Sequence, residues 1–217
     1  MNDNTLSMDL IFPTYLYRIK VEQFLDDALT ATNKALDLVY TEPLNELYPV
    51  YHTHQMRHYE ELANFVNYVG LTGWKILDSQ GYQMDDKEVY FEAMWCQEHR
   101  KTSGMDVHVH PNNACQLVGF YVIACDEEEA KRPVITVYDP KPAKIQIGLD
   151  NKNLAVISPA SNAINYKVEP GLLVFTNAWV PHSISRNPSE VPFKVMHFNI
   201  GVRPVAPKPF AQPAEVI

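Results

Sequence analysis

From residue 86 onward the chain is a succession of short runs rich in β-branched and aromatic residues, with turn residues between them. No helical periodicity separates these runs, of which there are about eight: VYFEAMWCQEH, CQLVGFYVIA, PVITVYD, AKIQIGL, NLAVIS, INYKVE, GLLVFTNA and FKVMHFNIGV. Many short strands without intervening helices are typical of a β-sandwich or a jelly-roll. Residues 86–203 are therefore predicted to form an all-β core.

The first 85 residues have a different pattern. Segments 21–40 and 60–77 space their apolar residues as amphipathic helices do, and segment 9–19 is apolar and β-rich, as an edge strand would be. The expected architecture is mainly β with N-terminal helices, a double-stranded β-helix (jelly-roll, cupin-like) flanked by two or more helices. We expect one domain over 1–217, with a helical support region (1–85), a jelly-roll core (86–203) and a Pro-rich tail (204–217). The helices would buttress the sheet and could carry a homodimer contact.

Composition limits the cellular compartments and the binding partners that we expect for this protein. The 217 residues carry a formal charge of −8, which disfavours binding to duplex nucleic acid because both surfaces repel. No apolar run approaches the roughly 20 residues that span a bilayer, and the N-terminus lacks the basic region of a signal peptide. Three cysteines without a CxxC pair favour a reducing, cytoplasmic compartment and exclude a cysteine-rich metal site.

Three histidines are spaced as ligands of one metal ion. His108 and His110 form an HVH motif, and in a strand residues i and i+2 point to the same face. His182 follows the apolar run GLLVFTNAWVP and could return to the same end of the barrel. Two nearby ligands and one distant ligand make a three-point site, as in non-haem Fe(II) oxygenases. HVH alone is weak support, since such a pair also occurs on surface strands and loops.

The other histidines are interpreted differently. The HTH motif with His52 and His54 has the same spacing but lies in a polar, loop-like region, so we expect it at the surface or at the rim of the site. His58 and His99 serve as comparisons. His197 alternates with apolar residues on the last strand, which predicts either a core histidine or one that lines a pocket.

Around these residues the sequence resembles the 2-oxoglutarate/Fe(II)-dependent oxygenases of bacteria and of tailed phages, including those of marine and cyanobacterial hosts. The matching pieces are DLIFPTYLYRI, HVHPNNACQLVGFYVIA, VITVYDPK, VEPGLLVFTNAWVPHSISRNPSE and FKVMHFNIGV. They cover most of the chain, and segment 20–85 matches only loosely. The resemblance implies a double-stranded β-helix, Fe(II) and 2-oxoglutarate, and, for a phage protein, the host cytoplasm as its location.

The wider superfamily holds iron with an H-x-D/E…H triad. Carried over, His108 takes the first ligand position and His182 the last, while His110 stands where a carboxylate is usual. This departure implies either a three-histidine site or a carboxylate supplied from elsewhere. Asp139 in VYDPKP is the first candidate for that carboxylate, and Asp106 is a weaker one.

The same superfamily holds the far carboxylate of 2-oxoglutarate with a basic residue on the final strand. That position maps to Lys194, twelve residues after His182, with Arg203 as the fallback. A lysine inside a barrel requires an anion, because a buried unpaired ammonium is costly; the alternative is a solvent-facing edge lysine. Gln116 and Tyr121, on the strand after HVH, could hydrogen-bond the cosubstrate, or could face outward and pack, respectively.

Several residues near the expected site, most of them aromatic, are interpreted mainly as structural. Trp179 and Pro181 would rigidify the turn before His182, and could also form a hydrophobic wall that keeps water from the iron. Phe91 and Trp95 alternate on a strand and are expected in the core rather than as a substrate platform.

The predicted activity is the oxidation of a small-molecule or protein substrate by O₂, with hydroxylation as the expected type. The metal would supply the chemistry and the protein the orientation. Two alternatives stay open. One is a three-histidine, cupin-type dioxygenase or isomerase that does not use 2-oxoglutarate. The other is a non-catalytic phage jelly-roll that serves as a structural or host-interaction module.

Overall fold

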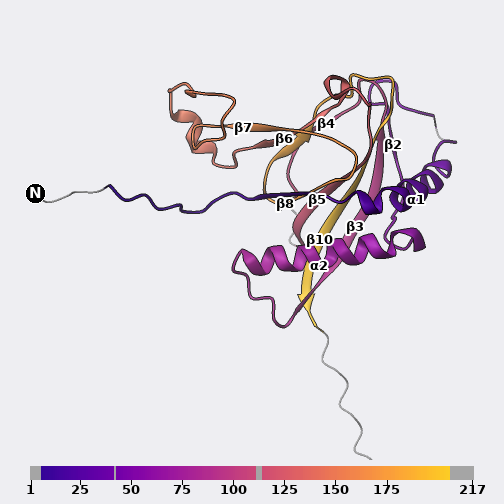
Figure 1. Cartoon of the computed structure of the whole chain (residues 1–217), viewed down its shortest axis with the longest axis horizontal. Helices are drawn as coiled ribbons and strands as arrows, with labels where there is room; N and C mark the ends of the chain where they lie inside the picture. Colours follow the sequence, from indigo (N-terminus) through magenta and orange to yellow (C-terminus); the bar gives the residue numbers. More distant parts are fainter. Residues whose placement is uncertain (1–5, 42, 111–113, 206–217) are drawn as a thin grey trace, which may run out of the picture.

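A computed structural model describes residues 6–41, 43–110 and 114–205. It contains two antiparallel sheets and two α-helices (Figure 1). The six-stranded sheet has the order β1 (Leu16–Lys20), β8 (Leu172–Asn177), β5 (Cys115–Ala124), β10 (Phe193–Pro204), β3 (Lys87–His99) and β2 (Val50–His52). The four-stranded sheet has the order β4 (Met105–His108), β9 (His182–Ile184), β6 (Val134–Tyr138) and β7 (Ala163–Lys167). Every pairing of neighbouring strands is antiparallel.

The helices cover one face of the six-stranded sheet. They are α1 (Leu25–Asp37) and α2 (Ala63–Ser79), each preceded by a short 3-10 turn, η1 (Glu22–Phe24) and η2 (Glu60–Leu62). Both helices are amphipathic and bury apolar side chains against the strands in one core cluster. Its members from β3, β5 and β10 are Phe91, Met94, Cys96, Leu117, Tyr121, Ile123, Met196, Phe198 and Ile200.

The other face of this sheet packs against the four-stranded sheet. A second core cluster joins Phe120, Val122 and Val195 to Ile135 and Ile184 of the facing sheet. A strand that is covered on both faces needs apolar residues at successive positions, which explains the unbroken run CQLVGFYVIA of β5.

Side-chain alternation along β10 decides which residues face the space between the sheets. Phe193 and Val195 belong to the cluster between the sheets, whereas Met196 and Phe198 belong to the helix-side cluster. By the same alternation His197 points inward, towards the four-stranded sheet. The first half of β10 therefore presents its odd-numbered residues to the interior and its even-numbered residues to the helices.

The expected architecture is confirmed at the level of two antiparallel sheets with two helices. Residues 16–19 of segment 9–19 lie in the edge strand β1, residues 9–15 form no strand, and segments 21–40 and 60–77 contain α1 and most of α2. The support region is not only helical, because β1 and β2 contribute to the six-stranded sheet. The greater part of the Pro-rich tail, residues 206–217, lies outside the described residues.

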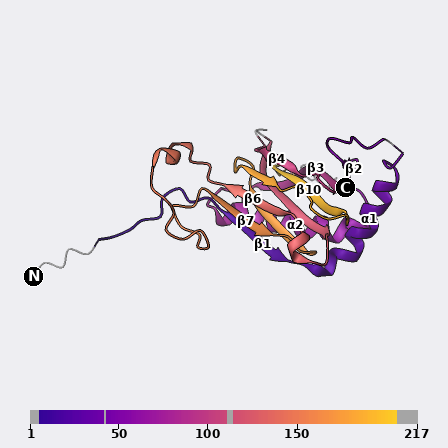
Figure 2. The same ribbon diagram turned by 90° about the horizontal axis from the view of Figure 1, so that it is seen from above.

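Two of the expected strands are absent. AKIQIGL and NLAVIS lie between β6 and β7, where the structure has the 3-10 helix η4 (Pro142–Gln146) followed by turns and irregular chain. Both edges of β6 are taken, by β7 and by β9, and neither run pairs with the outer edge of β7, so their strand-forming residues have no partner among the described strands. The segment extends away from the sheets on the same side as residues 6–15 (Figure 2).

The remaining global expectations concern membranes and disulfides. Neither α-helix of the described chain has the length and apolar character needed to cross a bilayer. Cys96, Cys115 and Cys125 all carry free thiols. A third short 3-10 turn, η3 (Glu129–Lys131), connects β5 to β6.

Candidate metal centre

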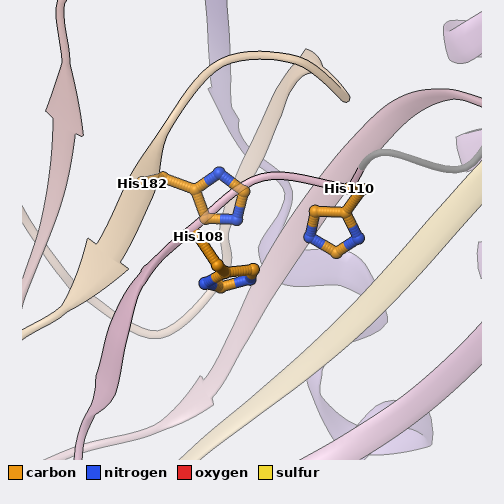
Figure 3. Close-up of side chains that lie close together, drawn as sticks. All are labelled: His108, His110 and His182. Carbon is orange, nitrogen blue, oxygen red and sulfur yellow. The ribbon is translucent and has the colours of Figure 1, made fainter.

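Three histidines converge between the two sheets (Figure 3). His108 ends β4 and lies directly opposite His182 at the start of β9, with ring centroids 4.5 Å apart. His110 lies just beyond β4, where its backbone N–H donates to the carbonyl of Ala178 at 2.9 Å. One ligand nitrogen from each ring can be chosen so that all three lie within 4.8 Å of one another. That spacing suits coordination of one metal ion.

Backbone carbonyls orient two of the three rings. Nδ1 of His108 lies 2.8 Å from the carbonyl oxygen of Asp106, and Nδ1 of His182 lies 2.9 Å from that of Val180. A carbonyl can only accept, so in each ring Nδ1 carries the proton and Nε2 keeps a lone pair. Histidines that ligate metals have this arrangement, in which the second nitrogen donates to a fixed acceptor.

Two ring nitrogens of the cluster have no hydrogen-bond partner among the described residues. Nε2 of His182 and Nε2 of His110 are both buried and lack any hydrogen bond among the described residues. A buried polar atom without a partner costs about 1–3 kcal/mol, so two such atoms side by side call for a ligand. A metal ion would satisfy both, and the residues present therefore fit a metal.

Two of the three histidines are kept in the neutral form that binds a cation. Burial lowers the pKa of His182 to about 4, and it does the same for His110, with His108 adding a smaller effect. Both rings are therefore neutral near pH 7, as metal ligation requires. Three neutral imidazoles leave the full charge on a divalent ion, whereas a carboxylate in the middle position would reduce it by one.

The alternative carboxylates do not reach this group. The side chain of Asp139 accepts from Nζ of Lys144 at 2.8 Å and from the backbone N–H of Lys141. Asp106 contributes its backbone carbonyl to His108, while its carboxylate lies outside the metal-sized cluster. Within the described chain, the cluster consists of histidines alone.

The structure does not bring Lys194 to the histidines. Its ammonium donates to the side-chain oxygen of Asn33 at 2.8 Å and lies 3.3 Å from the carboxylate of Glu98. Asn33 belongs to α1, so Lys194 points to the helix side of the sheet. The expectation that it faces the barrel interior fails because the inward positions at this end of β10 belong to Phe193 and Val195.

Two further residues expected at the cosubstrate also lie elsewhere. Tyr121 packs in the helix-side core, and its hydroxyl donates to the carbonyl of Val21 at 2.8 Å. Arg203 lies near the end of β10, where it is exposed, pairs with Glu88 at 2.6 Å and stacks over the ring of Tyr90. Both side chains have partners of their own within the protein.

The inner wall beside the histidines is aromatic and polar. The Phe120 ring contacts both His182 and His197, each with a centroid separation of 5.2 Å. Trp95 stacks on His197 at 5.3 Å, so it belongs to this wall rather than to the helix-side core that holds Phe91. The sequence left His197 as a core or pocket residue and did not single out Phe120. The odd-numbered apolar pattern of β10 carried the signal for His197.

Gln116 and Trp179 line a cavity of about 310 Å³ near the end of the six-stranded sheet. None of the three histidines lines it, and two of its lining residues, Leu77 and Met84, belong to the helix-side core. Trp179 is 49% exposed at its rim. The lining residues are Leu77, Tyr82, Gln83, Met84, Lys87, Cys115, Gln116, Asn177, Trp179 and Val202.

The comparison histidines lie outside the cluster. His54 and His58 are exposed, and His52 lies in β2. His99 is buried, and both of its nitrogens are satisfied, Nδ1 by Ser103 at 2.8 Å and Nε2 by Gln97 at 3.0 Å. The HTH and HVH motifs therefore differ in environment despite their identical spacing.

Known structures share this fold. The non-haem α-ketoglutarate-dependent carbocyclase SnoK of nogalamycin biosynthesis superposes with a TM-score of 0.62 at 14% identity, covering 87% of this chain and 79% of SnoK. A Pseudomonas putida prolyl-4-hydroxylase gives 0.56 at 8% identity, covering 87% and 92%. HygX of Streptomyces hygroscopicus, solved with nickel, 2-oxoglutarate and hygromycin B, gives 0.56 at 9%, covering 87% and 83%.

These similarities are structural. No protein-family model matches the sequence, and no curated protein matches it. At such identities the comparisons establish that this chain has the fold of the 2-oxoglutarate/Fe(II) oxygenases. Activity has to be argued from the site itself.

Proposed function

We propose that this protein is an Fe(II)- and 2-oxoglutarate-dependent oxygenase. The observation that carries the proposal is the cluster of His108, His110 and His182, with two buried Nε2 atoms that have no hydrogen-bond partner among the described residues. The shared fold supports iron over the other metals that accept imidazole ligands. Part of the proposal is that the two sheets form a double-stranded β-helix over residues 86–203. Their interleaved strand order supports this part.

Iron with 2-oxoglutarate would supply the oxidising chemistry, in which O₂ is consumed and 2-oxoglutarate is converted to succinate and CO₂ as the substrate is oxidised. The protein's own residues would hold the metal and orient its ligands. His108 and His182 are aimed through their Nδ1 protons, and the backbone bond to Ala178 fixes His110. Phe120 and Trp95 exclude water from one side of the centre.

For the substrate, we propose a small molecule, with a peptide side chain as the alternative, and hydroxylation is the reaction type we expect. The cavity of about 310 Å³ does not define this substrate, because none of the three histidines lines it and Asn177 in its wall is already hydrogen-bonded to Gln80.

Anaerobic reconstitution tests the first part of the proposal. We expect one Fe(II) per chain, and a charge-transfer absorption band when 2-oxoglutarate is added. Admission of O₂ should then release succinate, more rapidly when a substrate is present. Bound iron without any 2-oxoglutarate band or succinate would count against the proposal, and absence of bound iron would refute it.

A second function is favoured by one observation. Lys194 is engaged with Glu98 and Asn33 on the helix side of the sheet, so the expected cationic anchor for 2-oxoglutarate is absent from the interior. A three-histidine, cupin-type dioxygenase would need no such anchor. Oxygen consumption with Fe(II) and a candidate substrate, in the absence of 2-oxoglutarate, would favour this second function.

A further inference from the structure

His197 is a buried polar residue that the metal cluster does not use. Its side chain lies on the inner face of β10, and the residue is 2% exposed. Trp95 stacks on one side of its ring, with an interplanar angle of 13°, and Phe120 meets it edge-on at 87°. The two aromatic contacts hold the imidazole in one orientation.

The Nε2 atom of His197 has no hydrogen-bond partner in the described structure. His99 provides the internal comparison, because it is equally buried on an adjacent strand of the same sheet and yet both of its nitrogens are paired. Burial alone therefore does not leave histidines unpartnered in this protein. An oriented, unpaired nitrogen in a protein interior indicates a place for a bound molecule.

One aromatic ring links the metal cluster to His197. Phe120 lies between the metal ligand His182 and His197 and contacts each ring at the same centroid distance of 5.2 Å. A chelating ligand that extends from the metal across Phe120 would meet His197 next. Such a ligand would have one end at the metal and its other end at Nε2 of His197.

The charges of the interior limit what can hold an anionic far end. None of the lysines and arginines within the described ranges is buried. Lys194, the nearest cation along β10, is engaged by Glu98 on the opposite face. The imidazole of His197 is the polar side chain on the inner face of this part of β10 that could donate to a carboxylate entering the interior.

We propose that Nε2–H of His197 donates a hydrogen bond to the far carboxylate of 2-oxoglutarate. The proposal rests on the proposed function, since it presupposes that this cosubstrate chelates the metal. Trp95 and Phe120 act as positioning residues that hold the imidazole. His197 thereby takes the role that the sequence assigned to Lys194.

Removing the donor and removing the carboxylate, separately and together, tests this assignment. The full-length protein is loaded with Fe(II) without oxygen and titrated with 2-oxoglutarate and with 2-oxopentanoate, which has a methyl group in place of the far carboxylate. The charge-transfer absorption reports both dissociation constants. In the wild-type protein we expect 2-oxoglutarate to bind at least about tenfold more tightly, the effect of one hydrogen bond to a charged group.

His197→Phe keeps a flat ring against Trp95 and removes the donor. We expect this preference to fall at least about fivefold, chiefly through weaker binding of 2-oxoglutarate. His197→Gln retains an N–H donor and should keep part of the preference. Iron content and the dissociation constant of 2-oxopentanoate show whether either variant has lost its fold.

Lys194→Gln is the matched control, because it alters the same strand on its other face. We expect it to leave the preference unchanged. The assignment is overturned if Lys194→Gln abolishes the preference, if His197→Phe leaves it intact, or if the wild-type protein binds both acids equally while iron stays bound. If the iron-loaded protein binds neither acid, the proposed function fails and the assignment fails with it.

Discussion

The two faces of β10 treat their polar side chains in opposite ways. On the helix side, Lys194 is neutralised by Glu98 and hydrogen-bonded to Asn33, so its charge is fully accounted for by the protein. On the inner side, His197 keeps an unpaired nitrogen, and His182 on the facing sheet keeps another. One face uses these polar groups to join a helix to a sheet, and on the other face two imidazole nitrogens stay open to a ligand. Buried Thr32 of α1 also lacks a hydrogen-bond partner for its hydroxyl among the described residues, so the convergence of three imidazoles marks the candidate site.

The largest expected effect lies on the inner side. His182→Ala removes the ligand that the carbonyl of Val180 orients, and we expect the affinity for Fe(II) to fall by more than about 100-fold, beyond the loss typical of outer-shell changes. Anaerobic titration with iron analysis measures it. His58→Ala alters an exposed histidine and should leave affinity unchanged. If His182→Ala and the wild-type protein bind Fe(II) with equal affinity, the metal centre does not lie at these histidines on the inner face.

Acid should lower the free energy of unfolding of the protein through the buried histidines of the inner side. Burial lowers the pKa of His99 and of His182 to about 4, below the value of about 6.5 in an unfolded chain. Between these values the histidines are protonated in the unfolded chain and neutral in the folded chain. The free energy of unfolding therefore falls as the pH drops from 6.5 to 4. We expect a loss of about 2–3 kcal/mol for each histidine.

Denaturant unfolding of the metal-free protein at a series of pH values measures this loss. The metal-free form is required because bound metal adds its own proton competition. His99→Phe, which removes one of the buried histidines with a lowered pKa, should show a shallower dependence over the same window. A stability independent of pH between 6.5 and 4 would show that these imidazoles are protonated in the folded state.

The helix side should respond in stability and not in metal binding. Lys194→Met removes one partner of Glu98, a buried carboxylate that retains its contact with Arg100 at 2.6 Å. We expect a loss of about 1–2 kcal/mol, the cost of leaving a buried charge less fully compensated. Chemical denaturation measures the loss. A reduced iron content in this variant would contradict the separation of the two faces.

The smallest effect is expected at the exposed end of β10. Arg203→Met breaks an ion pair with Glu88 in which both side chains are open to solvent, at 61% and 44% exposure. Such pairs contribute about 0–1 kcal/mol, and added salt should reduce even that. A loss above this range in denaturant unfolding, or weaker binding of 2-oxoglutarate, would assign Arg203 a larger role than the structure suggests.

The elements with a clear period could be predicted from the sequence. The helical spacing of segments 21–40 and 60–77 corresponds to α1 and α2, and the long apolar runs correspond to β5, β8 and β10. AKIQIGL and NLAVIS carry strand-forming residues without forming strands, because they pair with no strand of the described structure. Pairing partners come from other parts of the chain, and local composition does not contain them.

For the site, the sequence by itself determined which imidazoles could act together. HVH and a histidine after a distant apolar strand are properties of spacing, and the structure draws His108, His110 and His182 into one cluster. Only the tertiary structure decided the facing of Lys194 and His197. A strand reverses its side-chain direction at every residue, so the shift of a single position exchanges the interior for the exterior. Which parity faces the metal depends on how β10 lies between β3 and β5, and that is settled by packing on both faces of the sheet.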